Sequence, residues 1–338
     1  MIVPIIVPQQ TISSWTAGTA QCGGTAQVPV HLVAPLASPG WGNLDERRGV
    51  TMSFRIDDAG RPLGIERSGP VYAADAADLA PSLAASRFAP GAGRARCTLT
   101  YTLSRTAVAT ASPTLVMGSL IAPPGGAYRE RLLPAGSSCD RPPPAPLLRA
   151  FPDSKALPPA PGIVRWSWIG YDIDRDGRPI AVRVAGGTGD AALDRAAVRA
   201  VAQSRYERGA RQGCRYRYWQ NATPLPAPPS PDVATWRAAP ATCAPDLPWV
   251  RRPVLAYPDA YRRRGIEGWA IVAFDVAPWG ETGNVRVLAA EPSTEFGTAA
   301  MQVIRGATKP AAASGYSGCV EKVMFHMSNA PHDPAALP

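Results

Sequence analysis

Three stretches of the chain alternate hydrophobic and polar residues, or place apolar residues on both faces, and then reach a glycine. Val50–Ile56 (VTMSFRI) has an apolar residue at every second position, the pattern of a half-buried β-strand. Trp166–Ile173 and Ala270–Val276 are predicted strands of the same kind. A glycine and a second apolar strand follow each, so the pattern predicts three β-hairpins. The turn glycines are Gly60, Gly177 and Gly280.

An amphipathic helix is predicted after each hairpin. In the clearest case the apolar residues lie at i, i+3, i+4, i+7 and i+8 from Phe296 to Ile304, after Ser293 or Thr294 as N-cap. Asp190 is the predicted N-cap of the second helix. The first is expected to begin near Asp78, because Pro81 fits only in a first turn. A last strand then begins at a cysteine in each copy, and the three strands are Cys97–Leu103, Cys214–Trp219 and Cys319–Met327.

The spacing of the cysteines shows that the unit is triplicated. Successive pairs are separated by 75, 75 and 76 residues, and the turn glycine lies 38, 38 and 37 residues after the first cysteine. Six cysteines allow 15 pairings, of which the repeat selects one. Each bond would close a loop of about 75 residues and stabilise its unit by about 4 kcal/mol. The selected pairs are Cys22–Cys97, Cys139–Cys214 and Cys243–Cys319.

Six buried free thiols in a cytosolic protein are the alternative interpretation of the cysteines. Zinc binding is disfavoured, because the sequence has no Cys-x-x-Cys pair and its three histidines do not bracket one. We therefore expect no metal and no cofactor. The three histidines are His31, His326 and His332.

The repeat predicts an α+β protein of three tandem small domains. Each is expected to be a three-stranded antiparallel sheet with helices packed on one face and one disulfide per domain. Clustered prolines, among a total of 38, indicate linkers between the units. The expected division is an N-terminal segment 1–21, first unit 22–104, linker 105–138, second unit 139–221, Pro-rich linker 222–242, third unit 243–328 and tail 329–338.

The composition excludes some functions and indicates the cellular compartment of the protein. The net charge is +9, but only three residues are lysine and the longest basic run is Arg262–Arg264, so no nucleic-acid partner is expected. The basic cluster of that run with Arg251 and Arg252 is expected to form a solvated face, with contact to anionic cell-wall or lipid groups as the alternative. Disulfides persist in oxidising compartments, which favours the bacterial periplasm. Met1–Pro8 is apolar but short and lacks a basic residue, so we expect this start to lie inside or downstream of an export signal or anchor.

The third unit resembles a known family. Tyr257-Pro258, the basic segment up to Gly265 and Gly268, the strand ending in Phe274-Asp-Val and the turn at Gly280 are similar to the C-terminal domain of TonB-type energy transducers. The first and second units match more weakly. The family's usual aromatic after the helix is replaced in the third unit by Ala-Thr-Lys-Pro.

The resemblance implies a binding role in the periplasm. Such domains engage outer-membrane receptors, for transport of siderophores and similar nutrients, by adding a receptor peptide to the free edge of the last strand. The implied peptide-binding edge is Val320, Glu321, Lys322, Val323, Met324 and Phe325. Other periplasmic proteins are possible partners, and peripheral association with the cell envelope is a further possibility.

The sequence also bears on two other functions. A cell-envelope scaffold of packed TonB-C-like repeats, without energy coupling, is the main alternative. An enzyme is not expected, because the sequence has no Gly-x-Ser-x-Gly elbow and no histidine recurs between the units. Asp172–Gly177 resembles half of a calcium loop, but Arg183 stands where the loop needs glutamate, so a hairpin turn is favoured.

Overall fold

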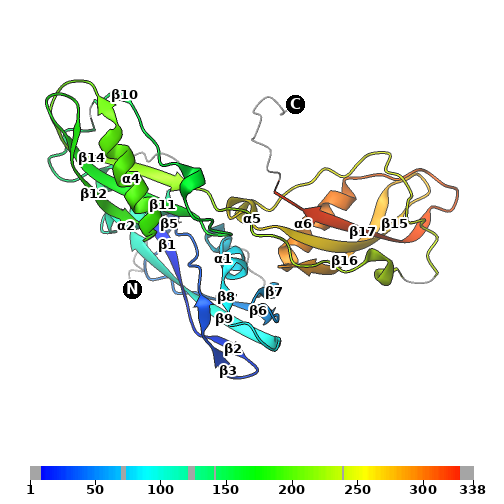
Figure 1. Ribbon diagram of the computed structural model, residues 1–338. Coiled ribbons are helices and arrows are strands. Elements are labelled where there is room, and N and C mark those ends of the chain that lie inside the picture. The colour runs from blue at the N-terminus through cyan, green and yellow to red at the C-terminus, as the bar shows by residue number, and fades with distance from the viewer. Residues whose placement is uncertain (1–8, 70–73, 121–125, 141, 238–239, 328–338) are drawn as a thin grey trace, which may run out of the picture.

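The computed structural model describes residues 9–69, 74–120, 126–140, 142–237 and 240–327. The predicted tail 329–338 and the apolar start Met1–Pro8 lie outside these residues. The described chain is α+β, with small antiparallel sheets, short helices and three disulfides. Figure 1 shows the second unit, in green, and the third, in orange to red, at opposite ends, with the first, in blue to cyan, beside their junction.

The same sheet order recurs three times, with the hairpin's first strand in the centre and the last strand of the unit beside it. A helix packs against the hairpin in each case. In the first unit these elements are β6 (Gly49–Ile56), β7 (Pro62–Ser68), α1 (Leu79–Ala85) and β9 (Arg94–Ala107). In the second they are β11 (Arg165–Ile173), β12 (Pro179–Gly187), α4 (Ala191–Gln203) and β14 (Arg211–Gln220). In the third they are β15 (Gly268–Val276), β16 (Thr282–Glu291), α6 (Thr294–Arg305) and β17 (Tyr316–Phe325).

The first unit departs from the three-stranded sheet that we expected. Its sheet has seven strands, because four further strands of the same chain join beyond β9. The expectation missed β1 and most of β2 because segment 1–21 was taken to lie outside the unit, and it assigned no strand to β3 or β5 within the unit. The added strands are β1 (Gln9–Ala17), β2 (Ala20–Cys22), β3 (Thr25–Gln27) and β5 (Ser38–Gly42).

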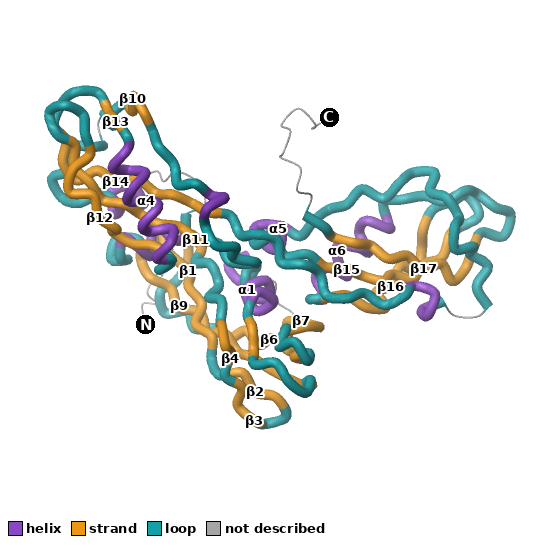
Figure 2. Tube along the Cα trace, viewed as in Figure 1, coloured by secondary structure: helices purple, strands orange, loops and turns teal. Residues whose placement is uncertain are grey.

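Shorter elements complete the described chain, and Figure 2 shows how much of it is loop. Two small ladders bring together β4 (Pro29–His31) with β8 (Arg87–Phe88) and β10 (Pro146–Leu148) with β13 (Arg205–Tyr206). The remaining helices are α2 (Pro113–Ser119), α3 (Gly126–Leu132) and α5 (Asp259–Arg263). Single 3-10 turns lie at Ala74–Ala76, Ser154–Ala156 and Val233–Trp236.

The helix starts follow the predicted caps. The Asp190 side chain accepts a hydrogen bond from the Leu193 N–H, and the Ser293 hydroxyl accepts one from Glu295 N–H. These bonds satisfy backbone donors that the first turn of a helix leaves without intrahelical partners. Helix α1 begins directly after Asp78, as predicted, although the Asp78 carboxylate serves a different contact.

A glycine and an aromatic side chain shape each hairpin turn. At Gly60 and Gly177, both at positive φ, a Cβ would lie 2.1 Å from the carbonyl oxygen of Phe88 or Tyr206. The ring of that residue packs on the central strand, with 5.8 Å between centroids for Phe88 and Phe54. In the third unit Lys309 occupies the equivalent place. Trp249 supplies the missing ring there, and the pairs Tyr171–Tyr206 and Trp249–Phe274 also lie 5.8 Å apart.

Each unit carries one disulfide from its first segment to its last strand. The bonds join the pairs that the repeat selects, and the described residues include no free cysteine. Each bond ties the segment before the hairpin to the start of the last strand. The disulfide pairing is therefore the one that the spacing of the cysteines in the sequence predicts.

The units pack against one another, through a buried arginine that we expected to be solvated. Arg264 is 1% exposed and donates to both oxygens of Asp78 in the first unit. It also donates to the carbonyl oxygens of Ala34 and Gly162. A buried charge is tolerated when it is paired and hydrogen-bonded in this way. Part of the basic run is thus structural, and it joins all three units.

The two linkers cover the sheet faces opposite α4 and α6. Helix α2 packs on Trp166 and Trp168 of β11. The Pro-rich linker packs on β15, where Pro228 accepts a hydrogen bond from the Trp269 indole at 2.9 Å. The predicted linker therefore also packs against the third sheet over this stretch. Strands β11 and β15 are buried on both faces as a result.

Candidate functional site

In the last strands β9, β14 and β17, equivalent residues direct their backbone N–H and C=O groups to the outer side, away from the central strand of the sheet. Successive residues of a strand direct their N–H and C=O groups to opposite sides. In β9 the carbonyl of Thr100 points outward, since it accepts a hydrogen bond from Gly18 at 2.8 Å. The equivalent residues, three positions after the cysteine of each strand, are Thr100, Arg217 and Lys322. The backbone N–H and C=O groups of Arg217 and Lys322 therefore also point outward. By the same alternation the outward residues are Thr98, Thr102, Arg215, Trp219, Val320 and Met324.

The outer edge of β9 is already occupied. Strand β1 pairs antiparallel with it from Thr11↔Ala107 to Ala17↔Tyr101, and β2 continues along it to Cys22↔Cys97. Figure 1 shows β1 running beside β9. Ile12 is fully buried and Trp15 is 6% exposed, so the added strand is anchored by apolar side chains as well as by the ladder. The first unit therefore contains strand addition within one chain.

The outer edge of β17 is open over the predicted peptide-binding residues. Thr242 and Cys243 donate backbone hydrogen bonds to the Ser317 carbonyl at the start of the strand. From Val320 to Phe325, β15 is the only described strand that pairs with it. Backbone N–H and C=O groups left unpaired at a sheet edge form a template for another strand.

Side chains along β17 are held from both faces of the sheet. Val323 and Phe325 belong to the core beneath α6. Val320 and Met324 pack against the Pro-rich linker. The Lys322 ammonium donates to Ser230 Oγ at 3.1 Å and to the Pro231 carbonyl. The edge is consequently rigid, which reduces the entropy lost when a peptide docks.

One acidic group lies among these side chains. Burial raises the pKa of Glu321 above its ordinary value, while Lys309 and Arg237 partly offset this effect. The residue at the same place in the first unit is Leu99, which is buried. Glu321 thus places a partly desolvated carboxyl group where β9 has an apolar side chain.

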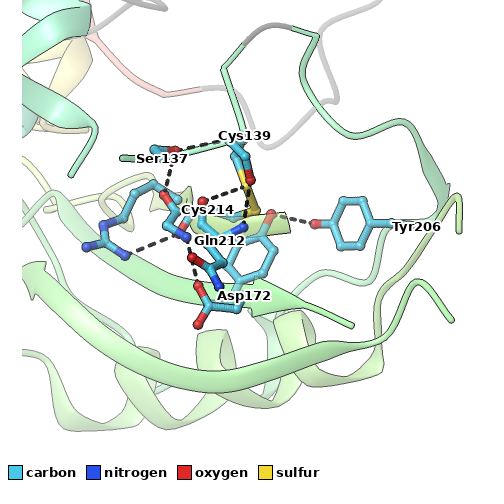
Figure 3. Close-up of a disulfide and its surroundings, with 10 residues drawn as sticks. Ser137, Cys139, Asp172, Tyr206, Gln212 and Cys214 are labelled. Atoms are coloured by element: carbon cyan, nitrogen blue, oxygen red, sulfur yellow. Dashed lines mark hydrogen bonds between the residues drawn. A yellow bond between two sulfur atoms is a disulfide. The ribbon is translucent and has the colours of Figure 1, made fainter. Parts of the chain in front are cut away.

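The edge of β14 is open in the same way. At its start, Ser138 N–H donates to the Gln212 carbonyl and the Ser137 hydroxyl to the Gly213 carbonyl. Figure 3 shows Ser137 and Cys139 lying over Gln212, next to the disulfide with Cys214. Beyond this point β11 is the only described strand beside β14.

The family-motif residues of the third unit build the support of the β17 edge. The Tyr257 hydroxyl donates to the Ile266 carbonyl, and its ring packs on Phe325 with 5.6 Å between centroids. Pro258 precedes α5 as its N-cap. A Cβ on Gly268 would lie 2.6 Å from the Glu291 carbonyl oxygen, so the close approach of these strands requires glycine.

The other three motif residues shape the chain around that support. Gly265 and Gly280 have positive φ values of 63° and 98°, a conformation that glycine adopts at little cost. Phe274 lies in the core. These positions explain why the motif is structural, while the edge that it supports carries the candidate binding groups.

The segment that resembles a calcium loop is a tight turn. Asp174 Oδ1 accepts hydrogen bonds from the backbone N–H groups of Asp176 and Arg178. This is the local role that aspartate commonly plays in turns. His326 is exposed and lies 3.3 Å from the Glu267 carboxylate. Within the described ranges, no group of three or more His, Cys, Asp or Glu side chains is placed to hold a metal ion.

Sequence reasoning missed that the first unit's edge is filled. The segment Gln9–Ala17 does contain residues typical of a strand, because the apolar Ile12 and Trp15 lie among polar and β-branched residues. Its period is irregular, so no strand was predicted. No helix among the described residues is long and apolar enough to cross a membrane.

Comparison with known families agrees with the resemblance. Residues 168–223 and 253–322 match the family model described as Gram-negative bacterial TonB protein C-terminal. The two matched segments contain most of the second and third sheets, including β14 and most of β17. No curated protein matches the chain. Both segments are therefore TonB C-terminal domain-like, whereas the first unit lies outside the matched residues.

Proposed function

We propose, from its two TonB C-terminal-like segments, that this chain is a periplasmic binding protein that takes up a partner peptide by strand addition at β17. The residues that meet the peptide are Val320, Glu321, Lys322, Val323, Met324 and Phe325. The partner is an outer-membrane receptor peptide or another periplasmic protein. This role is binding rather than catalysis.

One observation carries the proposal, namely that β1 occupies the equivalent edge of β9 while β17 is open. The filled edge supports the proposal, because β1 pairs antiparallel with β9 at the place equivalent to β17. The outward groups of Val320, Lys322 and Met324 supply the same donors and acceptors. Three disulfides favour an oxidising compartment, in agreement with a periplasmic location.

The experiment removes one outward backbone donor of β17 and compares the result with a variant that keeps this donor. A synthetic peptide copying the periplasm-facing N-terminal segment of an outer-membrane receptor is titrated into the isotope-labelled full chain. We expect amide shifts at Val320, Lys322 and Met324, and loss of binding in Lys322→Pro, which removes an outward donor. The matched control is Lys322→Ala, which removes the same side chain and keeps the outward N–H, and circular dichroism checks the fold of both variants. Shifts confined to other units would contradict the proposal.

A cell-envelope scaffold is a second candidate, favoured by the way the units are joined. Glu291 accepts hydrogen bonds from Gly64 and Arg55, and Ile65 donates to the Pro292 carbonyl, so the first and third units share a continuous interface. Retention on purified cell-wall material, unchanged by Lys322→Pro and lost on Arg264→Met, would favour the scaffold. Retention that Lys322→Pro abolishes would favour strand addition.

A further inference from the structure

A cavity lies between the second sheet and the helices α2 and α3, on the sheet face opposite α4. It consists of two adjoining hollows, of about 390 and 220 Å³, which share four lining residues. Its floor crosses the sheet, because Arg215 is on β14, Trp168 is on the central strand β11 and Ala185 is on β12. The cavity therefore belongs to the face of the sheet. The four shared residues are Leu132, Leu133, Trp168 and Arg215.

The roof of the cavity is apolar and comes from the chain before the second sheet. Met117 is in α2 and Leu120 follows it, while Leu132 ends α3 and Leu133 comes next. All of these residues precede segment 168–223, so the roof lies outside the residues that match the TonB family model. An apolar lining with a few polar groups is typical of sites for small molecules.

Two arginines at one wall of the cavity have no carboxylate partner. Arg215 and Arg217 project from the same face of β14 and lie about 7 Å apart along the strand. Nη1 of Arg217 donates to the carbonyl oxygens of Met117 and Leu120, and Nη1 of Arg215 donates to that of Cys214. Among the described residues, no carboxylate is within ion-pair distance of either guanidinium, and neither Nη2 has a hydrogen-bond acceptor. Both groups are therefore available to an anion.

The positive charge of these arginines is partly desolvated. Burial lowers the pKa of Arg215, and the charge of Arg183 lowers it further, while Asp172 partly offsets both effects. Burial also lowers the pKa of Arg217. Asp172 is already engaged, because its Oδ1 accepts a hydrogen bond from the Gly213 N–H. Since arginine stays charged at neutral pH, an anionic ligand would offset the cost of this desolvation.

The floor of the cavity holds the Arg215 guanidinium in place. Trp168 is 3% exposed, and the guanidinium carbon of Arg215 lies over its ring, 5.6 Å from the centroid. A Cβ on Gly170 would lie 2.3 Å from Arg215 Nη1, so the guanidinium also needs a glycine beneath it. The Trp168 indole N–H and the Arg215 Nε–H are buried and have no hydrogen-bond partner within the described chain. Buried donors are normally paired, so this floor favours a ligand that brings an acceptor.

We infer that this cavity binds a small amphiphilic carboxylate, with its head group at Arg215 and Arg217 and its apolar chain under Leu132 and Leu133. Guanidinium groups form strong charge-assisted hydrogen bonds with carboxylates. The apolar chain gains free energy by leaving water. Side chains of the sheet face and the roof hold this ligand, and it uses no backbone group of a strand edge. The inference is independent of the proposed function, which concerns β17.

The test is isothermal titration calorimetry of the full chain with decanoate, below the concentration at which decanoate forms micelles. Decylammonium keeps the apolar chain and reverses the charge, whereas acetate keeps the head group and lacks the chain. We expect saturable binding of decanoate and binding at least about tenfold weaker for decylammonium, because the arginines donate to a carboxylate and repel an ammonium group. Acetate should show no saturable binding over the same concentration range.

Variants locate the ligand. Arg215→Gln should weaken decanoate binding about tenfold, and Leu133→Trp should weaken it by filling the space for the chain. Arg195→Gln makes the same change of charge on the exposed side of α4, across the sheet, and should bind as the unaltered chain does. In nuclear magnetic resonance spectra the indole N–H signal of Trp168, assigned by its loss in Trp168→Phe, should shift on addition of decanoate. Circular dichroism checks each fold, and Arg215→Gln keeps the test decisive if Leu133→Trp does not fold.

Three outcomes would overturn the inference. The first is no saturable binding of decanoate, and the second is equal binding of decanoate and decylammonium, which would indicate an apolar surface without selection for charge. The third is decanoate binding that Arg215→Gln leaves unchanged while Lys322→Pro removes it, which would place the ligand on the third unit. Lys322→Pro should otherwise bind decanoate normally, so failure here and failure of the proposed function are separate results.

Discussion

The segment that precedes the hairpin takes a different route in the first unit from its route in the second and third. In the first unit it runs along the outer edge of β9 as β1 and β2. In the other two it lies across the sheet face opposite the helix, as α2 or as the Pro-rich linker. One route fills the edge and leaves the face bare, whereas the other covers the face and leaves the edge open.

The exposed face of the first unit matches this difference. Thr51 and Thr100 are bonded to each other through their hydroxyls, and the face around them is polar and partly or fully exposed. The corresponding positions are Trp168 and Arg217 in the second unit and Ile271 and Lys322 in the third. Polar side chains tolerate water, while a large apolar one needs a cover. The identity of a few side chains therefore decides which edge is available to a partner.

The largest expected effect comes from removing the anchor of β1. Trp15→Ala should destabilise the protein by about 3–5 kcal/mol, because a large buried side chain leaves a cavity, and because its indole N–H loses the Asp75 carbonyl, 2.7 Å away. The measurement is the free energy of unfolding in denaturant. The matched control is Trp41→Ala on β5, since Trp41 is 66% exposed and its loss should cost within about 0.5 kcal/mol. Equal costs for the two tryptophans would show that β1 is not anchored at this edge.

The second prediction compares the covered and bare faces at equivalent positions. Ile271 is fully buried under the Pro-rich linker, so Ile271→Ala should cost about 2–5 kcal/mol. Thr51→Ala, on the bare face, should change stability by about 0.5 kcal/mol or less. Denaturant unfolding of both variants checks this difference. A small effect at Ile271 would mean that the linker does not pack on the sheet.

The pattern of apolar residues in the central strands indicates which sheet faces are exposed and which are covered. Val50–Ile56 alternates apolar and polar residues, which is typical of a strand with one wet face. Ala270–Val276 is almost continuously apolar, as in a strand buried on both faces. A covering layer over the third sheet was therefore predictable. Its source was not, because a Pro-rich segment carries no periodic signal that marks a packed face.

The repeat itself was predictable in more detail than the first unit's sheet. Apolar periodicity, the turn glycines and the helix caps predicted the hairpins and the helices, because these depend on local sequence. The spacing of the cysteines predicted the disulfide pairs, because it repeats in all three units. The filled edge of β9 depends on contacts between Gln9–Ala17 and a strand about 90 residues later, which no local pattern reveals. The burial of Arg264 escaped prediction for the same reason, because its partner Asp78 lies in another unit.

A third prediction tests the open edges without changing the sequence. The outward amide of Thr102 lies in the ladder with Thr16, whereas those of Met324 and Trp219 face no described strand. Hydrogen exchange at Thr102 should be slower by on the order of 100-fold, because exchange there requires local unfolding. Nuclear magnetic resonance can follow these amides one by one. Protection at Met324 in the isolated chain would mean that its edge is filled, and the comparison of edges would fail.

The smallest expected effect concerns Glu321, which stands where the first unit has Leu99. Its pKa is raised by burial, so the folded state holds the proton more tightly than the unfolded state does. The stability that this proton provides is fully present below the ordinary pKa of 4.5 and is lost as the pH rises through the raised value. Glu321→Gln keeps the shape and removes the charge. The variant should match the unaltered chain at pH 4 and exceed it at pH 8 by less than about 1 kcal/mol, because Lys309, Arg237 and solvent screen the carboxylate. Thermal unfolding across this pH range measures the difference. A variant that is less stable at pH 8 would show instead that the ionised carboxylate stabilises the β17 edge through Lys309.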